Sequence, residues 1–135
     1  MRTRDARVED AAAIEALLRL LDHEAAPVEA RLASPLPGDV VLVAERERVV
    51  AVAAAATFHA FEYPRPQLRV SAIAVAPTAR RSGVGRALVR ALEARASALG
   101  CFRVELTSAH HLEPAHAFWR ALGYRDAGRR FVRGV

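Results

Sequence analysis

The sequence predicts an α/β (α+β) fold, with a mixed central sheet of about six to seven strands flanked by about four helices. Three observations lead to this prediction. Short valine-rich segments have the period of strands, and longer segments with apolar residues at i, i+3, i+4 and i+7 have the period of helices. Glycine and proline separate the segments. The predicted order is strand, two helices, three strands, helix, strand, helix and two strands.

The first third of the chain predicts one edge strand and two helices. Residues 2–7 can form a short strand at the sheet edge. The segment Val8 to Leu21 predicts a helix, because Ile14, Leu17, Leu18 and Leu21 share one face. Pro27 can start a shorter helix that runs to about Ser34, and the prolines that follow end it.

The middle of the chain predicts three strands. Residues 40–44 and 49–52 flank the charged residues 45–48, a pattern typical of a hairpin. Residues 53–56 are all alanine, which favours helix, but the β-branched residues before them favour continuing the strand. After a proline-containing break, residues 68–75 predict the next strand.

The last third predicts two helices and three short strands. The first helix runs from Gly83 to Leu99 and stops at Gly100, and the second starts near Pro114 with Phe118 and Leu122 facing inward. The expected strands cover residues 102–106, 124–126 and 130–132.

Length and composition narrow the class of protein. A chain of 135 residues suits a single domain over residues 1–135. The chain has no apolar run of about 18 residues that would predict a membrane span, and its N-terminus leads into an amphipathic helix, unlike a signal peptide. One cysteine, Cys101, cannot form an internal disulfide and is expected to pack at the start of a strand. A cytoplasmic protein is therefore expected.

The charge of the chain suits an anionic partner. The formal net charge is +5, and arginine supplies all 20 basic residues. Nucleic acid and a phosphate-rich cofactor both fit this charge. The arginines are spread along the chain, with no long basic run and few aromatic residues between them for base stacking. This pattern argues against nucleic-acid binding, although charge alone does not decide between the two partners.

A glycine-containing turn is the strongest functional signal. Residues 80–86 connect the strand at 68–75 to the helix that follows, and they contain three arginines, Gly83 and Gly85. Glycine allows a positive φ and a close approach of a ligand to the main chain. The first N–H groups of a helix lack partners and lie at its positive end. This combination predicts a phosphate or pyrophosphate site.

Two motifs resemble a known family. Residues 80–85, Arg-Arg-Ser-Gly-Val-Gly, fit R/Q-x-x-G-x-G/A, the acyl-CoA pyrophosphate loop of the GNAT superfamily of N-acetyltransferases. Residues 115–124 are similar to the second signature of that family, A-x-x-F-Y-x-x-L-G-F. The order of elements also resembles the GNAT fold over nearly the whole chain.

The resemblance implies an enzyme that transfers an acetyl group from acetyl-CoA to a primary amine, by direct attack in a ternary complex. It implies that Ile73, Ala74 and Val75 bind pantetheine and the thioester through the main chain. The residues that it implies for the pyrophosphate are Arg80, Arg81, Ser82, Gly83, Val84, Gly85 and Arg86. A backbone N–H near Val75 would stabilise the oxyanion. No metal is implied, and a homodimer is one expected state, since many such proteins are dimers.

The acid and base of the reaction are less well defined by the resemblance. Many relatives have a carboxylate on the strand before the loop, but the corresponding positions here hold Arg69, Ser71 and Ala72. Glu62 is the first candidate for the base, and the alternatives are His59, Glu105, His110 and His111. The tyrosine that usually protonates the leaving thiolate is replaced by Trp119, whose indole cannot serve as an acid.

These departures leave a second function open. A non-catalytic acyl-CoA-binding module would keep the loop and lack the acid and base. The dinucleotide fingerprint is excluded because Leu88 stands where it needs a third glycine, and the Gly-Lys-Ser/Thr of a P-loop is absent. The histidines near Glu113 match no closed metal site. The acceptor cannot be identified from the sequence.

Overall fold

The computed structural model describes residues 1–108 and 113–135. Its contacts divide the chain into two compact units, Met1–Glu105 and Leu106–Val135. The first unit contains most of the sheet and the helices that cover it, and the second contains the last helix and the C-terminal segment. The single domain expected over residues 1–135 stays a prediction.

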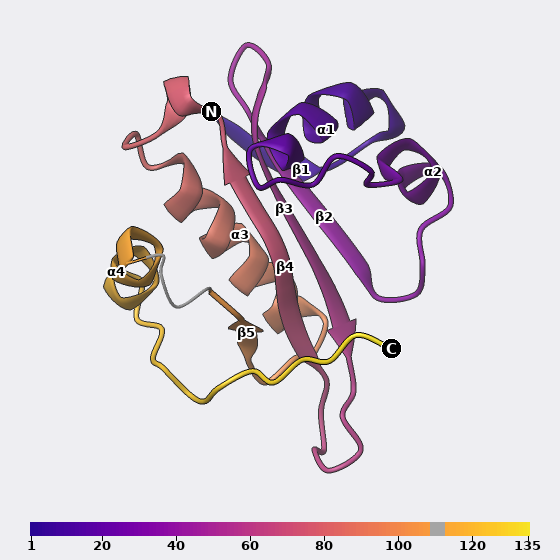
Figure 1. The fold of residues 1–135 in the computed structure, drawn as a ribbon, viewed down its shortest axis with the longest axis vertical. Coiled ribbons are helices and arrows are strands. Elements are labelled where there is room, and N and C mark those ends of the chain that lie inside the picture. Colours follow the sequence, from indigo (N-terminus) through magenta and orange to yellow (C-terminus); the bar gives the residue numbers. More distant parts are fainter. Residues whose placement is uncertain (109–112) are drawn as a thin grey trace. The chain divides into compact units, whose positions relative to one another are not determined.

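The sheet has five strands in the order β1-β2-β3-β4-β5, with neighbours hydrogen-bonded (Figure 1). The first four pair antiparallel in chain order. The bounds of the strands are Arg2–Asp5 for β1, Asp39–Glu45 for β2, Val49–Phe58 for β3, Gln67–Val75 for β4 and Val104–Leu106 for β5. The mixed α+β fold, the edge strand and the hairpin predicted from the sequence are confirmed.

Helices cover both faces of the sheet in the first unit. Helices α1 (Ala11–Arg19) and α2 (Val28–Ala33) lie on one face, and α3 (Val84–Ala98) lies on the other (Figure 1). The α1 face has a core that includes Ile14, Leu17, Val43, Val52 and Ala74. The predicted first helix starts with a 3-10 turn at Val8–Asp10 and ends two residues early, so only its centre is α-helical.

Strand β3 contains the run of alanines whose conformation was ambiguous. Ala51 and Ala53 are completely buried, and Ala55 is nearly so. A central strand with helices on both faces has little room for larger side chains, and this packing overrides the helix propensity of alanine. The interpretation of residues 53–56 as strand is confirmed.

Strand β4 contains a β-bulge at Ser71. Ala54 of β3 pairs with Ala72 and Ala55 pairs with Val70, so Ser71 is an extra residue without an opposite partner on β3. Successive residues of a regular strand point to opposite faces. Because the bulge inserts one residue, Ser71 and Ala72 both line a hollow on the α1 face.

The second unit contains α4 (Glu113–Ala121). Trp119 and Leu122 are buried, whereas Phe118, predicted to face inward, is only half-buried. Trp119 makes edge-on ring contacts with Phe118 and Tyr124, each with 5.1 Å between centroids. The larger indole therefore takes the inward position. Among the described residues, no helix is long and apolar enough to cross a membrane.

The prediction of about six to seven strands is corrected to five in the sheet formed by residues 1–108 and 113–135. Residues 124–126 and 130–132 form no strand, and every residue from 125 to 135 is exposed. The segment contains two glycines and an aspartate, which disfavour strands, and its apolar side chains Phe131 and Val132 stay exposed. Without burial, the conformational entropy lost on ordering a strand is not offset.

Candidate functional site

The loop between β4 and α3 has the backbone geometry of an anion site. A 3-10 turn at Pro77–Ala79 leads into it, and Arg81 and Gly83 adopt left-handed conformations with φ of 59° and 81°. A Cβ built on Gly83 would meet no atom within 4 Å, so the space beside this glycine is open. Successive N–H groups in such a turn form a concave surface that binds anions.

The N-terminus of α3 adds further backbone donors. The first helical hydrogen bond runs from Ala87 N–H to Gly83 O at 3.0 Å. The amides of Val84, Gly85 and Arg86 precede this bond and have no partner within the helix. Helix α3 is 15 residues long, so its dipole favours a negative charge at this end. The loop and the helix together suit a phosphate group.

Ser82 is held by neighbours on both sides. Its hydroxyl donates to the carbonyl oxygen of Ala79 and accepts a hydrogen bond from Arg46 Nη2 at 3.0 Å. Arg46 lies in the β2–β3 turn, which also lines a hollow of about 430 Å³ beside Thr78. Sequence reasoning missed Arg46, because residues 36 positions apart give no local signal of their contact.

The end of β4 directs main-chain groups away from β3. The N–H of Ala76 donates to Val50 O at 2.8 Å. In an antiparallel pair the hydrogen-bonded positions alternate, so the main-chain groups of Ile73 and Val75 point to the opposite side of β4. Arg80 Nε donates to Val75 O at 3.2 Å, in agreement with this orientation. Ile73 and Val75 therefore offer the kind of strand edge to which an extended ligand can bind.

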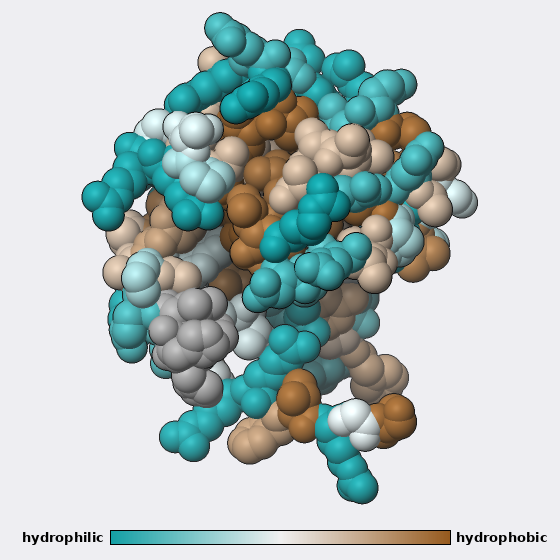
Figure 2. Space-filling view, turned by 45° about the horizontal axis from the view of Figure 1, so that its top comes forward, coloured by the Kyte–Doolittle hydropathy of each residue, from teal (hydrophilic) through white to brown (hydrophobic). Residues whose placement is uncertain are grey.

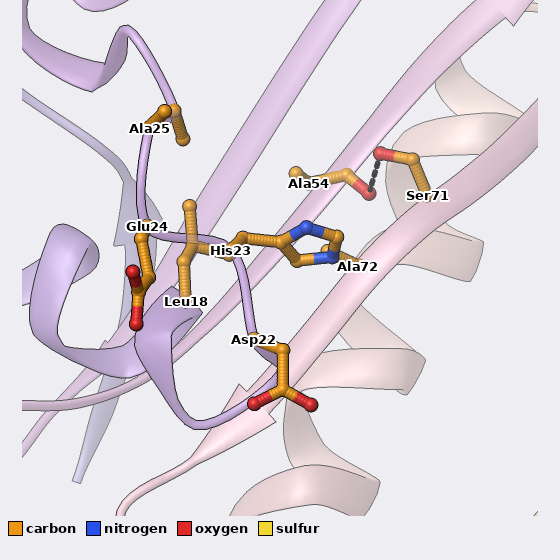
Figure 3. Close-up of a pocket in the computed structure, with 9 residues that line it drawn as sticks. Leu18, Asp22, His23, Glu24, Ala25, Ala54, Ser71 and Ala72 are labelled. Atoms are coloured by element: carbon orange, nitrogen blue, oxygen red, sulfur yellow. Dashed lines mark hydrogen bonds between the residues drawn. The ribbon is translucent and has the colours of Figure 1, made fainter.

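A hollow of about 590 Å³ lies on the α1 face of the sheet (Figure 3). The segment after α1 and the bulged part of β4 both line it. Its lining residues are Leu18, Asp22, His23, Glu24, Ala25, Ala26, Ala54, Ser71 and Ala72. The Ser71 hydroxyl donates to Ala54 O at 3.2 Å. The titratable groups of this hollow all come from the segment that follows α1.

The surface of the molecule has both apolar and hydrophilic regions. Figure 2 shows apolar residues gathered in the middle of one face, with hydrophilic residues around them. An apolar patch rimmed by polar residues is typical of binding surfaces.

Three of the residues predicted as bases lie outside the lining of the hollow. Glu62 is exposed in the turn after β3, and His59 Nε2 lies 2.6 Å from Tyr63 O in the same turn. Glu105 forms ion pairs with Arg69 at 2.6 Å and Arg103 at 2.9 Å. None of these three lines the hollow. His110 and His111 lie outside the described residues. The roles of all five stay predictions.

Two other predictions concern cysteine and metal. Burial raises the pKa of the Cys101 thiol, which lowers the thiolate fraction and disfavours a nucleophilic role. In residues 1–108 and 113–135, no group of three or more histidine, cysteine or acidic side chains is arranged to hold a metal ion.

The structure brings the predicted cofactor residues together at one end of the sheet. Ile73, Ala74 and Val75 form the end of β4, and residues 80–86 form the loop and the first turn of α3. Sequence reasoning missed the segment 22–26. A signal for its turn was present, since Asp22 follows a helix and aspartate tolerates the left-handed conformation that ends helices.

Several solved structures are similar to this chain. An acetyltransferase from Trypanosoma brucei has 26% identity and a TM-score of 0.84, with 99% of each chain covered. Aminoglycoside N-acetyltransferase AAC(6')-Iy, solved in complex with CoA, has 18% identity and a TM-score of 0.85, covering 99% of this chain and 93% of that one.

A third similar structure is a complex with sisomicin. It is aminoglycoside acetyltransferase meta-AAC0020 from an uncultured soil metagenomic sample, in complex with sisomicin. It has 16% identity and a TM-score of 0.84, and covers 99% of this chain and 95% of that one.

The sequence comparisons place the chain in a family. None of the curated proteins matches it significantly. The family model described as Acetyltransferase (GNAT) family matches residues 9–124, which include both motifs and the hollow. The chain therefore belongs to the GNAT acetyltransferase family.

Proposed function

We propose that this protein transfers an acetyl group from acetyl-CoA to a primary amine, by direct attack in a ternary complex. One observation carries the proposal, and it has two parts. The loop at the N-terminus of α3 is open and offers backbone N–H donors. The strand before this loop, β4, ends in residues whose main-chain groups point away from β3. Pyrophosphate and pantetheine need these two features side by side. Membership of an acetyltransferase family agrees with this reaction.

Each part of the cosubstrate has proposed partners. The pyrophosphate is bound by the amides and arginines of residues 80–86. Ile73 and Val75 bind pantetheine and the thioester through the main chain, whereas Ala74, which the sequence also suggested, has its main-chain groups directed toward β3. A donor aimed at the carbonyl oxygen would stabilise the negative charge that develops there during attack. The proposed catalytic unit is a single domain over residues 1–135, with acetyl-CoA and an amine as its substrates.

The acceptor is proposed to bind in the hollow on the α1 face. This hollow is lined by Ser71 and Ala72, which come directly before the proposed thioester residues on β4. Asp22 and Glu24 contribute negative charge to it, which suits a protonated amine. The similar structure solved with sisomicin is an example of an amine bound to a protein of this fold.

A non-catalytic acyl-CoA-binding module is the second candidate. It is favoured by Trp119, which stands where a proton-donating tyrosine is usual. The cytoplasmic location and the homodimer expected from the sequence stay predictions.

Calorimetry and turnover together test these candidates. We expect micromolar binding of acetyl-CoA and of CoA, and release of free thiol when sisomicin, 1,4-diaminobutane or benzylamine is added. Binding without turnover of any of these amines favours the non-catalytic module. No binding by the folded protein at millimolar acetyl-CoA rejects both candidates.

A further inference from the structure

We infer that His23 is a catalytic residue of this protein, which accepts the proton of the acceptor amine in the hollow on the α1 face. The inference rests on the proposed acetyl transfer. It assigns the base to the segment after α1, whereas the sequence pattern pointed first to Glu62.

The direction of the chain at His23 is fixed by the end of α1. Asp22 has a left-handed φ of 62°. The N–H of His23 donates to Leu18 O at 3.1 Å, and the N–H of Asp22 donates to Arg19 O at 3.0 Å. These two bonds form a Schellman motif, which ends the helix and turns the chain sharply. His23 therefore has an anchored backbone although its side chain is exposed.

The His23 ring extends from this turn toward the strands. In Figure 3 it points to the side of the hollow where Ala54, Ser71 and Ala72 lie, whereas the carboxylate of Glu24 lies on the other side of the segment. Because of the bulge, Ser71 and Ala72 face this hollow together. The ring thus faces the part of β4 just before the proposed thioester site.

No other group on the strand side of the hollow can accept a proton well. The strands contribute Ala54, Ala72 and Ser71, and the Ser71 hydroxyl already donates to Ala54 O. Helix α1 contributes Leu18. The other titratable groups that line the hollow are Asp22 and Glu24, both on the same segment as His23.

The imidazole is free to react. Within residues 1–108 and 113–135, the His23 side chain has no hydrogen-bond or ion-pair partner. A base must come within hydrogen-bond reach of the proton that it removes, and an unpaired ring beside an open hollow can do so. Imidazole also changes charge between about pH 5 and 8, where an alkylammonium with a pKa near about 10.4 stays protonated without help.

The bonds and protons of the proposed reaction balance. The acceptor enters as R–NH3⁺, and His23 takes one proton and passes it to solvent through the open hollow. The nitrogen lone pair attacks the thioester carbonyl carbon, forming the C–N bond. The C–S bond breaks, and the second proton of the nitrogen goes to the departing sulfur. The products are CH3CO–NH–R, HS–CoA and one released proton, so no separate acid at Trp119 is required.

The test compares His23→Gln, His23→Ala and Glu62→Gln with the wild type, using an amine that the wild type acetylates. We expect His23→Gln to lower kcat by about 100-fold, within the range for a general base, and to keep the wild-type affinity for acetyl-CoA. The wild-type rate should rise with pH as an imidazole loses its proton. His23→Gln should lack that rise, and added imidazole should restore part of the activity of His23→Ala.

Controls separate this inference from the proposed function. Glu29→Gln, an exposed change on α2 outside the hollow, should behave as wild type. Full activity and an unchanged pH profile in His23→Gln would overturn the inference and leave acetyl transfer intact. If Glu62→Gln, and not His23→Gln, loses the rise of the reaction rate with pH, the base is Glu62. A wild type that binds acetyl-CoA but acetylates no amine would reject the proposed function, and the inference with it.

Discussion

Arg46 Nη2 donates a hydrogen bond to the Ser82 hydroxyl at 3.0 Å, which joins the β2–β3 turn to the loop before α3. Ser82 in turn donates to Ala79 O. A loop that carries several unpaired N–H groups needs such support to keep the donors in one arrangement before a ligand arrives. Predictions for four sites follow from this and similar contacts.

Arg46→Ala should weaken acetyl-CoA binding. The loss of one hydrogen bond that orders the loop is worth about 1 kcal/mol, or roughly fivefold in Kd. Calorimetric titration of acetyl-CoA measures the effect. Arg48→Ala is the matched control, because it removes the same charge from the same turn without a contact to Ser82. Equal losses in the two variants would show that charge alone, and not the bond to Ser82, is responsible.

Gly83→Glu should abolish acetyl-CoA binding at micromolar concentrations. The new side chain would occupy the open space beside the loop and place negative charge next to the pyrophosphate. Gly100→Glu is the control, since Gly100 has a similar φ of 78° and its Cβ would also meet no atom within 4 Å. Both variants have the same backbone strain, so comparison by calorimetry isolates the ligand effect. A folded Gly83→Glu protein with normal affinity would disprove the role of the loop.

Asp10→Asn should destabilise the fold at neutral pH. Asp10 is buried and bonds Arg4 at 2.8 Å, with 9% and 12% of the two side chains exposed. Loss of this charge should cost about 2 kcal/mol, because Arg4 loses one charged partner and keeps the other, Glu45. Urea unfolding at pH 7 measures this. Asp5→Asn is the control, because the Asp5 side chain is 64% exposed in its pair with Arg95. This substitution should lower the free energy of unfolding by less than about 1 kcal/mol.

The same aspartate should make stability depend on acid pH. The hydrogen bonds from Arg4 lower the pKa of the Asp10 carboxyl below its ordinary value. A lowered pKa in the folded state contributes stability above the ordinary pKa, and this contribution is lost as pH falls through the folded pKa. Wild type should therefore lose stability below about pH 4. Asp10→Asn should show a shallower decline, with the remainder due to Glu45 and Asp39, whose pKa values are lowered by hydrogen bonds from Arg4 and Arg31.

Trp119→Tyr should fold and transfer acetyl groups at least as fast as wild type. A tyrosine can keep the ring contacts of Trp119 with Phe118 and Tyr124 and adds a hydroxyl that can donate a proton. Thiol release under saturating substrates measures the rate. Trp119→Ala is the contrasting variant, since removal of a buried indole costs about 3 kcal/mol or more. A folded Trp119→Tyr variant that loses most activity would give the indole a specific role.

Local pattern predicted most of the elements and one part of the site. The hairpin, the bulk of three helices and the glycine turn after β4 follow from periodicity, proline and glycine. The prediction of two C-terminal strands was wrong, because a short alternating segment forms a strand only where another part of the protein covers one of its faces. The hollow was missed for a related reason, since its residues come from segments about 30 and 50 positions apart.

The sequence by itself determined the family, the order of elements from β1 to α4 and the loop of residues 80–86, because these depend on residues that are neighbours in the chain. Only the tertiary structure decided that a bulge at Ser71 turns two successive side chains toward the turn containing His23. Strand register and helix packing are set by the sum of many distant contacts, and no single local pattern encodes them.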